Sequence, residues 1–216
     1  MTSSRPLTRS PCRWGGGAGN KYEDSYFAVE LEVIAKAAQL IDKFNAAGVI
    51  DRVVYLNHPE IWTFTQTGGS FSGAKVLVEP MITNFEKFNS NTGWTPDNGV
   101  PWNLVMQALS HFSYHVSSGM FVLCDLQGGV YSNGVVLTDP VVMTAARKFG
   151  PTDLGIDGIT TFFARHQCNR FCNPAWQRPR RQQALYPERQ GTLLEAMHVP
   201  TRGSRQSVSQ QRHGYN

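Results

Sequence analysis

The sequence predicts an α+β protein, and three observations support this class. Apolar residues recur at helical spacing in three stretches, four short apolar runs have the length of strands, and the two kinds of segment are interleaved irregularly. A length of 216 residues favours one domain with a sizeable core. Hydrophobic content of 41% and charged content of 17% are typical of a globular protein rather than a disordered one.

The first half of the chain starts irregularly and then becomes periodic. Residues 1–22 are rich in Gly, Ser, Arg and Pro and lack periodicity, so we expect them to be irregular. Apolar residues then recur at helical spacing from Phe27 to Ile41, and Gly48 follows the end of the pattern. The expected elements are an amphipathic helix over 26–45, a strand over 52–56, a short helix or turn over 58–64, a tight turn over 68–73 and a strand over 75–79.

The second half alternates polar loops with apolar runs. Turn-forming residues fill the stretch 84–99, which predicts a loop. After Trp176 the periodicity fades. The expected elements are a helix from Trp102 to Phe112, a strand over 120–125, a turn or hairpin tip over 128–134, a strand over 135–140, and a third helix around Ile159 to Phe163 that runs into a His/Cys cluster.

The positive charge lies in the C-terminal tail. Residues 177–216 hold seven arginines, no lysine and two glutamates, a sum of +5, and the whole chain carries +4. Residues 1–176 therefore sum to −1 and show no sign of a nucleic-acid surface. We expect the tail to be basic and disordered; binding of nucleic acid or an acidic partner is the less favoured alternative.

Composition also bears on the compartment. No apolar run approaches the roughly 18 residues that span a bilayer, and the N-terminus lacks the apolar core of a secretory signal. Cys168 and Cys172 stand four apart beside a histidine, which favours a metal over a disulfide. We therefore expect an intracellular, cytoplasmic protein without a membrane partner.

The His/Cys cluster has the composition of a zinc site. His166, Cys168 and Cys172 place three possible ligands within seven residues, and one helical turn between the cysteines would aim both sulfurs at one point. A structural zinc site needs four ligands, and His111 or His115 on the second helix could supply the last. The alternative is a pair of buried free cysteines beside a surface histidine.

A second group of polar residues suits a magnesium–phosphate unit. Asp125 and Gln127 flank an apolar residue at a strand end, where strand alternation would put both side chains on one face, and Asp139 ends the next apolar run. These oxygens could bind Mg²⁺, or one aspartate could act as a base; alternatively, both aspartates cap turns. The glycine-bracketed loop Gly150–Gly155 matches no Walker motif. Glu79 is either a hinge carboxylate or a solvated one.

Together, these motifs resemble the alpha-kinase family, which includes the myosin heavy chain kinases, elongation-factor-2 kinase and the channel-kinases. The helix ending in DKFNAAG also resembles a segment of that family. The resemblance covers about residues 24–175. The matching segments, in family order, are VEPMI, KFNSNTGW, ALSHFSYH, CDLQG, LTDP, FGPTDLG and FFARHQCNRFC.

The resemblance implies a two-lobed, kinase-like α+β fold and transfer of a phosphoryl group from Mg·ATP to Ser or Thr of a protein substrate. By this match Glu79 and the backbone near Met81 bind adenine. Asp125, Gln127 and Asp139 form the catalytic and Mg²⁺ centre. Asp125 is expected to be the base and Asp139 the metal ligand, although the two roles could be exchanged.

The resemblance also assigns the remaining site residues. Asn91 would help to line the nucleotide cleft. The family's glycine loop, implicated in substrate handling, corresponds to the segment with Gly150, Thr152, Asp153 and Gly155. A structural zinc would join the second helix to the C-terminal helix, and His111 is preferred over His115 because it occupies the ALSHF position. The zinc ligands would then be His111, His166, Cys168 and Cys172.

One part of the family pattern is not evident. The family's N-lobe has a strand with a nucleotide-binding lysine, whereas residues 1–22 contain no apolar strand, and Lys21 is the only lysine before the helix. We expect a kinase domain over 23–176 with a truncated N-lobe, in which Lys21 could replace the missing cation. The alternative is a catalytically impaired pseudokinase that acts as a zinc-stabilised binding module.

Overall fold

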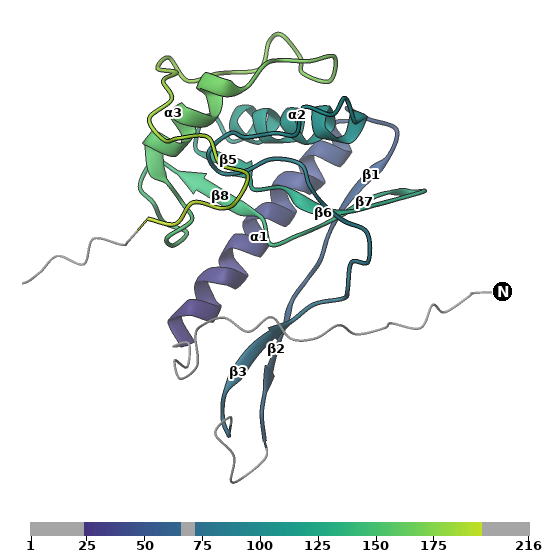
Figure 1. Cartoon of the computed structure of the whole chain (residues 1–216), viewed down its shortest axis with the longest axis vertical. Coiled ribbons are helices and arrows are strands. Elements are labelled where there is room, and N and C mark those ends of the chain that lie inside the picture. The colour runs from purple at the N-terminus through teal and green to yellow at the C-terminus, as the bar shows by residue number, and fades with distance from the viewer. Residues whose placement is uncertain (1–23, 66–71, 196–216) are drawn as a thin grey trace, which may run out of the picture.

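The computed structural model describes residues 24–65 and 72–195, and Figure 1 shows the arrangement of their helices and strands. Lys21 and part of the turn expected over 68–73 lie outside these residues. Among the described helices, none combines the length and apolar character needed to cross a bilayer. The elements are α1 (Asp24–Ala46), β1 (Val53–Leu56), β2 (Glu60–Thr63), β3 (Lys75–Val78), β4 (Phe85–Lys87), α2 (Pro101–Val116), β5 (Phe121–Cys124), β6 (Gln127–Tyr131), β7 (Gly134–Thr138), β8 (Val141–Thr144) and α3 (Gly155–Arg165).

The strands form three small sheets. The largest has the order β1-β7-β6-β4, in which β1 and β7 are parallel and the other pairs antiparallel. β5 pairs with β8, and β2 pairs with β3 in a hairpin that projects from the body at the bottom of Figure 1. Gly134 permits the close approach of β7 to β1, because a Cβ there would lie 2.0 Å from the carbonyl oxygen of Val53.

The main core lies between α1, α2 and the largest sheet. Phe44 of α1 is fully buried and meets Phe112 of α2 edge to face, with ring centroids 5.4 Å apart. Burial of a side chain such as Phe44 contributes about 2–3 kcal/mol. The side-chain amide of Asn45 donates to the carbonyl of Val54 at 2.8 Å and accepts from its N–H at 3.0 Å. This pair of bonds fastens the end of α1 to β1.

A second core cluster positions α3. Phe162 and Phe163 on its buried face pack with Met143 of β8 and Val122 of β5. Pro101 starts α2, where its missing N–H costs no helical hydrogen bond. α2 and α3 are thus held over β5 and β8, and the polar ends of these elements carry most of the residues predicted to be functional.

The mixed α+β class and all three helices agree with the sequence predictions, as do the strands β1, β3, β5 and β7. The short helix or turn expected over 58–64 is wrong, because Glu60–Thr63 pairs with β3. The loop over 84–99 contains β4, and the hairpin tip over 128–134 includes most of β6. β8 was not anticipated, because Pro140 obscured the start of a new strand directly after β7.

The tail expected to be disordered is ordered over residues 177–195. The Arg178 guanidinium donates to the carbonyls of Phe163 (3.2 Å) and His166 (3.1 Å). The N–H of Leu185 donates to Thr161 Oγ1 at 3.0 Å. Side chains and backbone groups of the body thus bind a segment without helical or strand periodicity, which is why periodicity gave no sign of it.

Candidate active site and metal centre

Asp125 lies in the two-residue link between two strands. β5 ends at Cys124 and β6 begins at Gln127, and Asp125 adopts a left-handed backbone with φ of 57°. The argument from strand alternation is therefore wrong, since Asp125 and Gln127 do not belong to one strand. The two side chains still meet, because Lys87 Nζ donates to Asp125 Oδ1 at 2.8 Å and to Gln127 Oε1 at 3.3 Å.

The structure connects Asp139 to the same group. Asp139 follows β7, and β7 pairs with β6 so that Thr138 lies opposite Gln127. Gln127 Nε2 is 3.3 Å from the backbone oxygen of Asp139 and 3.5 Å from its Oδ2. Lys87, Asp125, Gln127 and Asp139 thus form one continuous polar network, which we call the acidic network.

A pocket of about 340 Å³ borders the acidic network at Asp139. Its volume lies within the roughly 300–1,000 Å³ typical of small-ligand sites. The Glu79 carboxylate accepts a hydrogen bond from the Thr138 hydroxyl, and Asn57 Nδ2 donates to the Pro80 carbonyl at 3.0 Å. The lining residues are Tyr26, Glu30, Ile34, Asn57, Pro59, Leu77, Glu79, Pro80, Met81, Ile82, Phe85, Thr138 and Asp139.

Asn91 does not line this pocket. Its side chain is fully buried, and its Nδ2 donates to the carbonyls of Thr152 at 3.0 Å and Leu193 at 2.8 Å. Its Oδ1 accepts from the N–H of Leu193 at 2.9 Å. Asn91 therefore joins the glycine-bracketed loop to the C-terminal segment.

Asp153 organises the glycine-bracketed loop from within. Only 1% of Asp153 is exposed, and its carboxylate accepts from the N–H of Thr144 at 2.9 Å and from the Thr144 hydroxyl at 2.7 Å. It also accepts from the N–H groups of Phe149 (3.3 Å) and Gly155 (3.0 Å). Its carboxylate is directed inward, so any substrate contact of this loop comes from its backbone or from other side chains.

Sequence reasoning missed two residues that contact Asp125: Lys87, which belongs to the acidic network, and Thr192, which lies beside it. Lys87 lies on the unpredicted strand β4, directly opposite Gln127. Thr192, in the tail expected to be disordered, donates its hydroxyl to Asp125 Oδ2 at 2.7 Å. Residues 85–88 read Phe-Glu-Lys-Phe, which has no strand alternation to mark Lys87, and no local signal marked Thr192.

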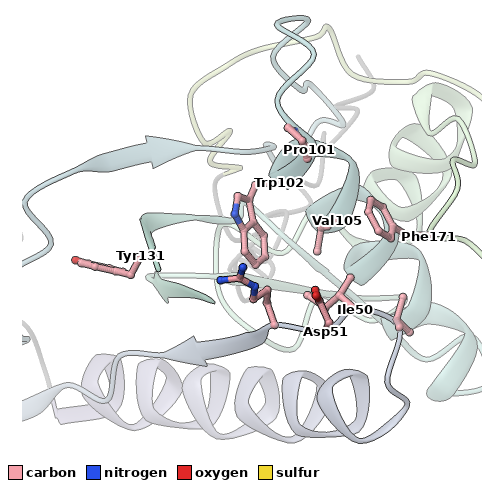
Figure 2. Close-up of a pocket in the computed structure, with 9 residues that line it drawn as sticks. Ile50, Asp51, Pro101, Trp102, Val105, Tyr131 and Phe171 are labelled. Atoms are coloured by element: carbon pink, nitrogen blue, oxygen red, sulfur yellow. The ribbon is translucent and has the colours of Figure 1, made fainter. Parts of the chain in front are cut away.

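A larger cavity, of about 480 Å³, lies elsewhere, and Figure 2 shows the residues around it. No residue predicted to be functional lines it, and its charged groups are one aspartate and one arginine. We place the functional site at the smaller pocket because it adjoins the acidic network, whereas the larger cavity does not. The lining residues of the larger cavity are Val49, Ile50, Asp51, Arg52, Pro101, Trp102, Val105, Tyr131 and Phe171.

The structure brings the four predicted zinc ligands together. One ligand atom from each of His111, His166, Cys168 and Cys172 lies within 4.8 Å of all the others. Cys168 Sγ is 3.6 Å from His111 Nδ1 and 3.8 Å from His166 Nε2. A tetrahedral zinc with bonds of about 2.3 Å to sulfur and about 2.1 Å to nitrogen separates such atoms by about 3.6 Å. The donor set and its spacing therefore fit zinc.

Both histidines of this His/Cys cluster have an outer hydrogen bond that leaves the inner nitrogen free. His111 Nε2 lies 3.1 Å from the Gln177 carbonyl, and His166 Nδ1 lies 3.2 Å from Gln107 Oε1. Because these oxygens only accept, the protons sit on the outer nitrogens. Burial, followed by the neighbouring His111, lowers the pKa of His166 to about 3, so its ring is neutral, as a metal ligand must be.

The segment that carries the two cysteines has a different local structure from the predicted helical turn. α3 ends at Arg165, so residues 166–172 form a non-helical loop and no helical turn separates Cys168 from Cys172. Burial is the main cause that raises the pKa of Cys172 to about 11, so its thiol stays protonated unless a cation replaces the proton. His115 lies outside the cluster, where its Nδ1 accepts from the N–H of Gln177 at 3.3 Å.

Comparison with known proteins gives consistent matches. The model of the alpha-kinase family matches residues 12–172. Alpha-protein kinase 1 of Dictyostelium discoideum is 31% identical over 148 residues, which are 67% of this chain and 10% of that protein. Eukaryotic elongation factor 2 kinase of Mus musculus is 33% identical over 132 residues, 58% of this chain and 17% of that protein. The chain thus spans a small part of the curated relatives it matches.

Solved structures agree with these matches. An alpha kinase from Entamoeba histolytica superposes with a TM-score of 0.66 at 24% identity, covering 82% of this chain and 72% of that one, and it supports the fold. The alpha-kinase domain of myosin-II heavy chain kinase A in complex with AMP-PNP gives a TM-score of 0.60 at 25% identity, covering 70% and 57%. The family match over residues 12–172, borne by this fold, establishes that the chain belongs to the alpha-kinase family, whose members are protein kinases.

Proposed function

We propose that this chain is an ATP-dependent protein serine/threonine kinase of the alpha type, which transfers the γ-phosphoryl group of Mg·ATP to a hydroxyl of a protein substrate. The observation that carries the proposal is the position of the acidic network beside the pocket that contains Glu79 and Met81. Phosphoryl transfer depends mainly on positioning and on neutralising charge, and this arrangement offers both.

The nucleotide would enter the pocket with its adenine toward Glu79 and the backbone near Met81. Asp139 lines the same pocket, so its carboxylate suits Mg²⁺, which prefers oxygen ligands. Bound magnesium would neutralise phosphate charge. The amide of Gln127 contacts Asp139 and therefore holds this carboxylate in place.

Asp125 is the residue we assign as base. Lys87 binds one of its oxygens, Oδ1, and so fixes the orientation of the carboxylate. The other oxygen, Oδ2, points to a hydroxyl of the chain itself, that of Thr192. A carboxylate oxygen within hydrogen-bond distance of a hydroxyl can accept its proton during transfer.

We also propose a structural zinc held by His111, His166, Cys168 and Cys172. It would connect α2 to the loop after α3 and contribute folding free energy. Cysteine ligation by thiolates agrees with a reducing compartment, so we propose an intracellular, cytoplasmic location.

The N-lobe cation is a separate proposal. Tyr26 and Glu30 of α1 line the pocket, and Lys21 stands a few residues before Tyr26 in the sequence. We propose that Lys21 supplies the cation of the nucleotide site.

A second candidate function is a pseudokinase that acts as a zinc-stabilised binding module. It is favoured by one observation: Asp125 is only 1% exposed, with both oxygens engaged within the chain.

Phosphorylation of a mixed Ser/Thr protein by the purified chain with Mg·ATP tests the proposed activity. We expect transfer in the wild-type chain and a loss of about 10²- to 10⁴-fold in Asp125→Asn. Asp97→Asn, at an exposed loop position, is the matched control and should retain full activity. Absence of transfer from a folded, zinc-containing wild-type chain would favour the pseudokinase.

A further inference from the structure

The C-terminal part of the described chain lies over the proposed base. Thr192 donates its hydroxyl to Asp125 Oδ2 at 2.7 Å, the oxygen that Lys87 leaves free. Thr192 itself is exposed, whereas Asp125 is buried. A threonine hydroxyl that donates to the base carboxylate has the position expected of a hydroxyl that accepts a phosphoryl group.

We propose that residues 185–195, here called the acceptor segment, occupy the groove that receives the protein substrate, and that Thr192 marks the position of the acceptor hydroxyl. The inference rests on the proposed kinase function, because Asp125 is the base only in that reaction. In Figure 1 the acceptor segment is the yellow stretch before the grey C-terminal trace.

The centre of the acceptor segment is bound as an extended peptide would be. Asn91 accepts from the N–H of Leu193 and donates to its carbonyl, at 2.9 and 2.8 Å. The Leu193 side chain packs against the second core cluster. The N–H of Glu195 donates to the carbonyl of Pro151 at 2.9 Å. Backbone bonds of this kind bind peptides of many sequences, and the side-chain contacts then provide specificity.

Two arginines bind acidic residues on either side of Thr192. Arg147 forms an ion pair with Glu195, three residues after Thr192. Arg165 lies 4.0 Å from the carboxylate of Glu188, four residues before Thr192. The groove therefore favours a Thr or Ser acceptor with an acidic residue four positions before it, an apolar residue directly after it and an acidic residue three positions after it.

Both arginines also contact Tyr186, and Arg165 is mostly buried whereas Arg147 is exposed. Arg165 Nη2 donates to the Tyr186 carbonyl at 2.6 Å, and its Nη1 donates to the Thr92 carbonyl at 2.5 Å. Arg147 Nη2 donates to the Tyr186 hydroxyl at 3.1 Å. A substrate peptide that displaced the acceptor segment would find the same two guanidinium groups.

The reaction in this groove balances without a further reactant. The acceptor hydroxyl oxygen forms a bond to the γ-phosphorus of ATP, and the bond from that phosphorus to the β–γ bridging oxygen breaks. The hydroxyl proton passes to Asp125 Oδ2, and ADP leaves. While the acceptor segment is in the groove, it competes with any protein substrate.

Peptide binding tests the groove without requiring catalysis. The probe is a fluorescein-labelled peptide of residues 185–195, measured by anisotropy against the full chain. In Glu188→Gln/Glu195→Gln, where the tethered competitor is weakened, we expect the peptide to bind about three- to tenfold more tightly than in the wild-type chain. A scrambled peptide should bind neither chain.

Charge exchange tests the side-chain contacts. In the Glu188→Gln/Glu195→Gln background, Arg147→Glu should weaken the peptide about tenfold, and a peptide with Glu195→Lys should regain binding. Lys148→Glu, the adjacent exposed cation, is the matched control and should change affinity less than twofold. Equal affinity of the peptide for all these chains, or no binding at millimolar peptide, would overturn the groove.

Catalysis distinguishes this inference from the kinase proposal. We expect Mg·ATP to phosphorylate the peptide at the position of Thr192, with a lower KM in the Glu188→Gln/Glu195→Gln chain. Phosphorylation of a generic protein, combined with a peptide that neither binds nor is modified, rejects the groove and retains the kinase. Peptide binding with the expected charge dependence but without any phosphoryl transfer retains the groove and rejects the kinase.

Discussion

The His/Cys cluster and the acidic network differ in the partners that their polar groups contact. In the His/Cys cluster four ligand atoms point at one another, and each histidine has an outer partner that fixes its free nitrogen. In the acidic network the carboxylates contact a lysine, an amide and a hydroxyl of the chain. The first geometry has the donor set and spacing of a metal site, whereas we propose that the second exchanges its partners for ligands.

From this difference we expect that the His/Cys cluster supports the fold and that the acidic network carries the chemistry. The His/Cys cluster joins segments that would otherwise be held only by weaker contacts, so its loss should be global. The acidic network sits at strand ends on an already formed sheet, so its loss should be local. The predictions below test this contrast, from the largest expected effect to the smallest.

Removal of zinc or of a zinc ligand should have the largest effect. Zinc binding in small structural sites is worth about 10–16 kcal/mol, as much as a whole domain's stability. We therefore expect Cys168→Ser, or chelation of the wild-type chain, to abolish the cooperative thermal transition, and metal analysis to find about one zinc per chain. His115→Gln, outside the cluster, should melt like the wild type. A metal-free chain of unchanged Tm would reverse the comparison.

Asp139→Asn should lower the activity of the chain and leave its thermal stability nearly unchanged. Because Asp139 lines the pocket, we expect turnover with Mg·ATP to fall about 10²-fold or more while Tm moves by no more than a few degrees. Turnover and thermal melting of the same preparations provide the measurement. Collapse of the fold, or retained turnover, would place Asp139 with the structural groups instead.

Lys87→Met should lower the free energy of unfolding by less than zinc removal does, but by more than a surface substitution does. It leaves a buried carboxylate at Asp125 without its cation, which costs about 3 kcal/mol in comparable cases. Urea denaturation of this variant can be compared with that of Lys148→Met, whose exposed side chain should contribute within about 0.5 kcal/mol. Equal urea midpoints for the two variants would show that the ion pair between Lys87 and Asp125 contributes as little to stability as a solvated surface ion pair.

Thr192→Val should have the smallest effect on stability. It removes one hydroxyl donor to Asp125, and a hydrogen bond to a charged group contributes about 1.5–3 kcal/mol at most when both partners are desolvated. Since Thr192 is exposed and water can replace it, we expect about 1 kcal/mol or less in urea denaturation. A loss comparable to that of Lys87→Met would mean that the acceptor segment is a permanent part of the fold.

Much of the site was recognisable from sequence because short motifs carry their own chemistry. His166, Cys168 and Cys172 indicated a zinc site through ligand type alone, and the loop that presents them need not be helical for that inference to hold. The class of fold and the three helices followed from apolar periodicity, which reports directly on burial. The strand over residues 60–63 was missed, since a four-residue run shows too little of either period.

The sequence by itself determined which residue types were available: two aspartates after apolar runs, a histidine–cysteine cluster and an ordered series of family motifs. Only the tertiary structure decided which of them meet. Pairing of β4 with β6 brings Lys87 into contact with Asp125, and packing of the C-terminal segment brings Thr192 into contact with the same carboxylate. The reason is physical: periodicity records which face of an element is buried, whereas contacts between residues far apart in sequence depend on how the elements pack.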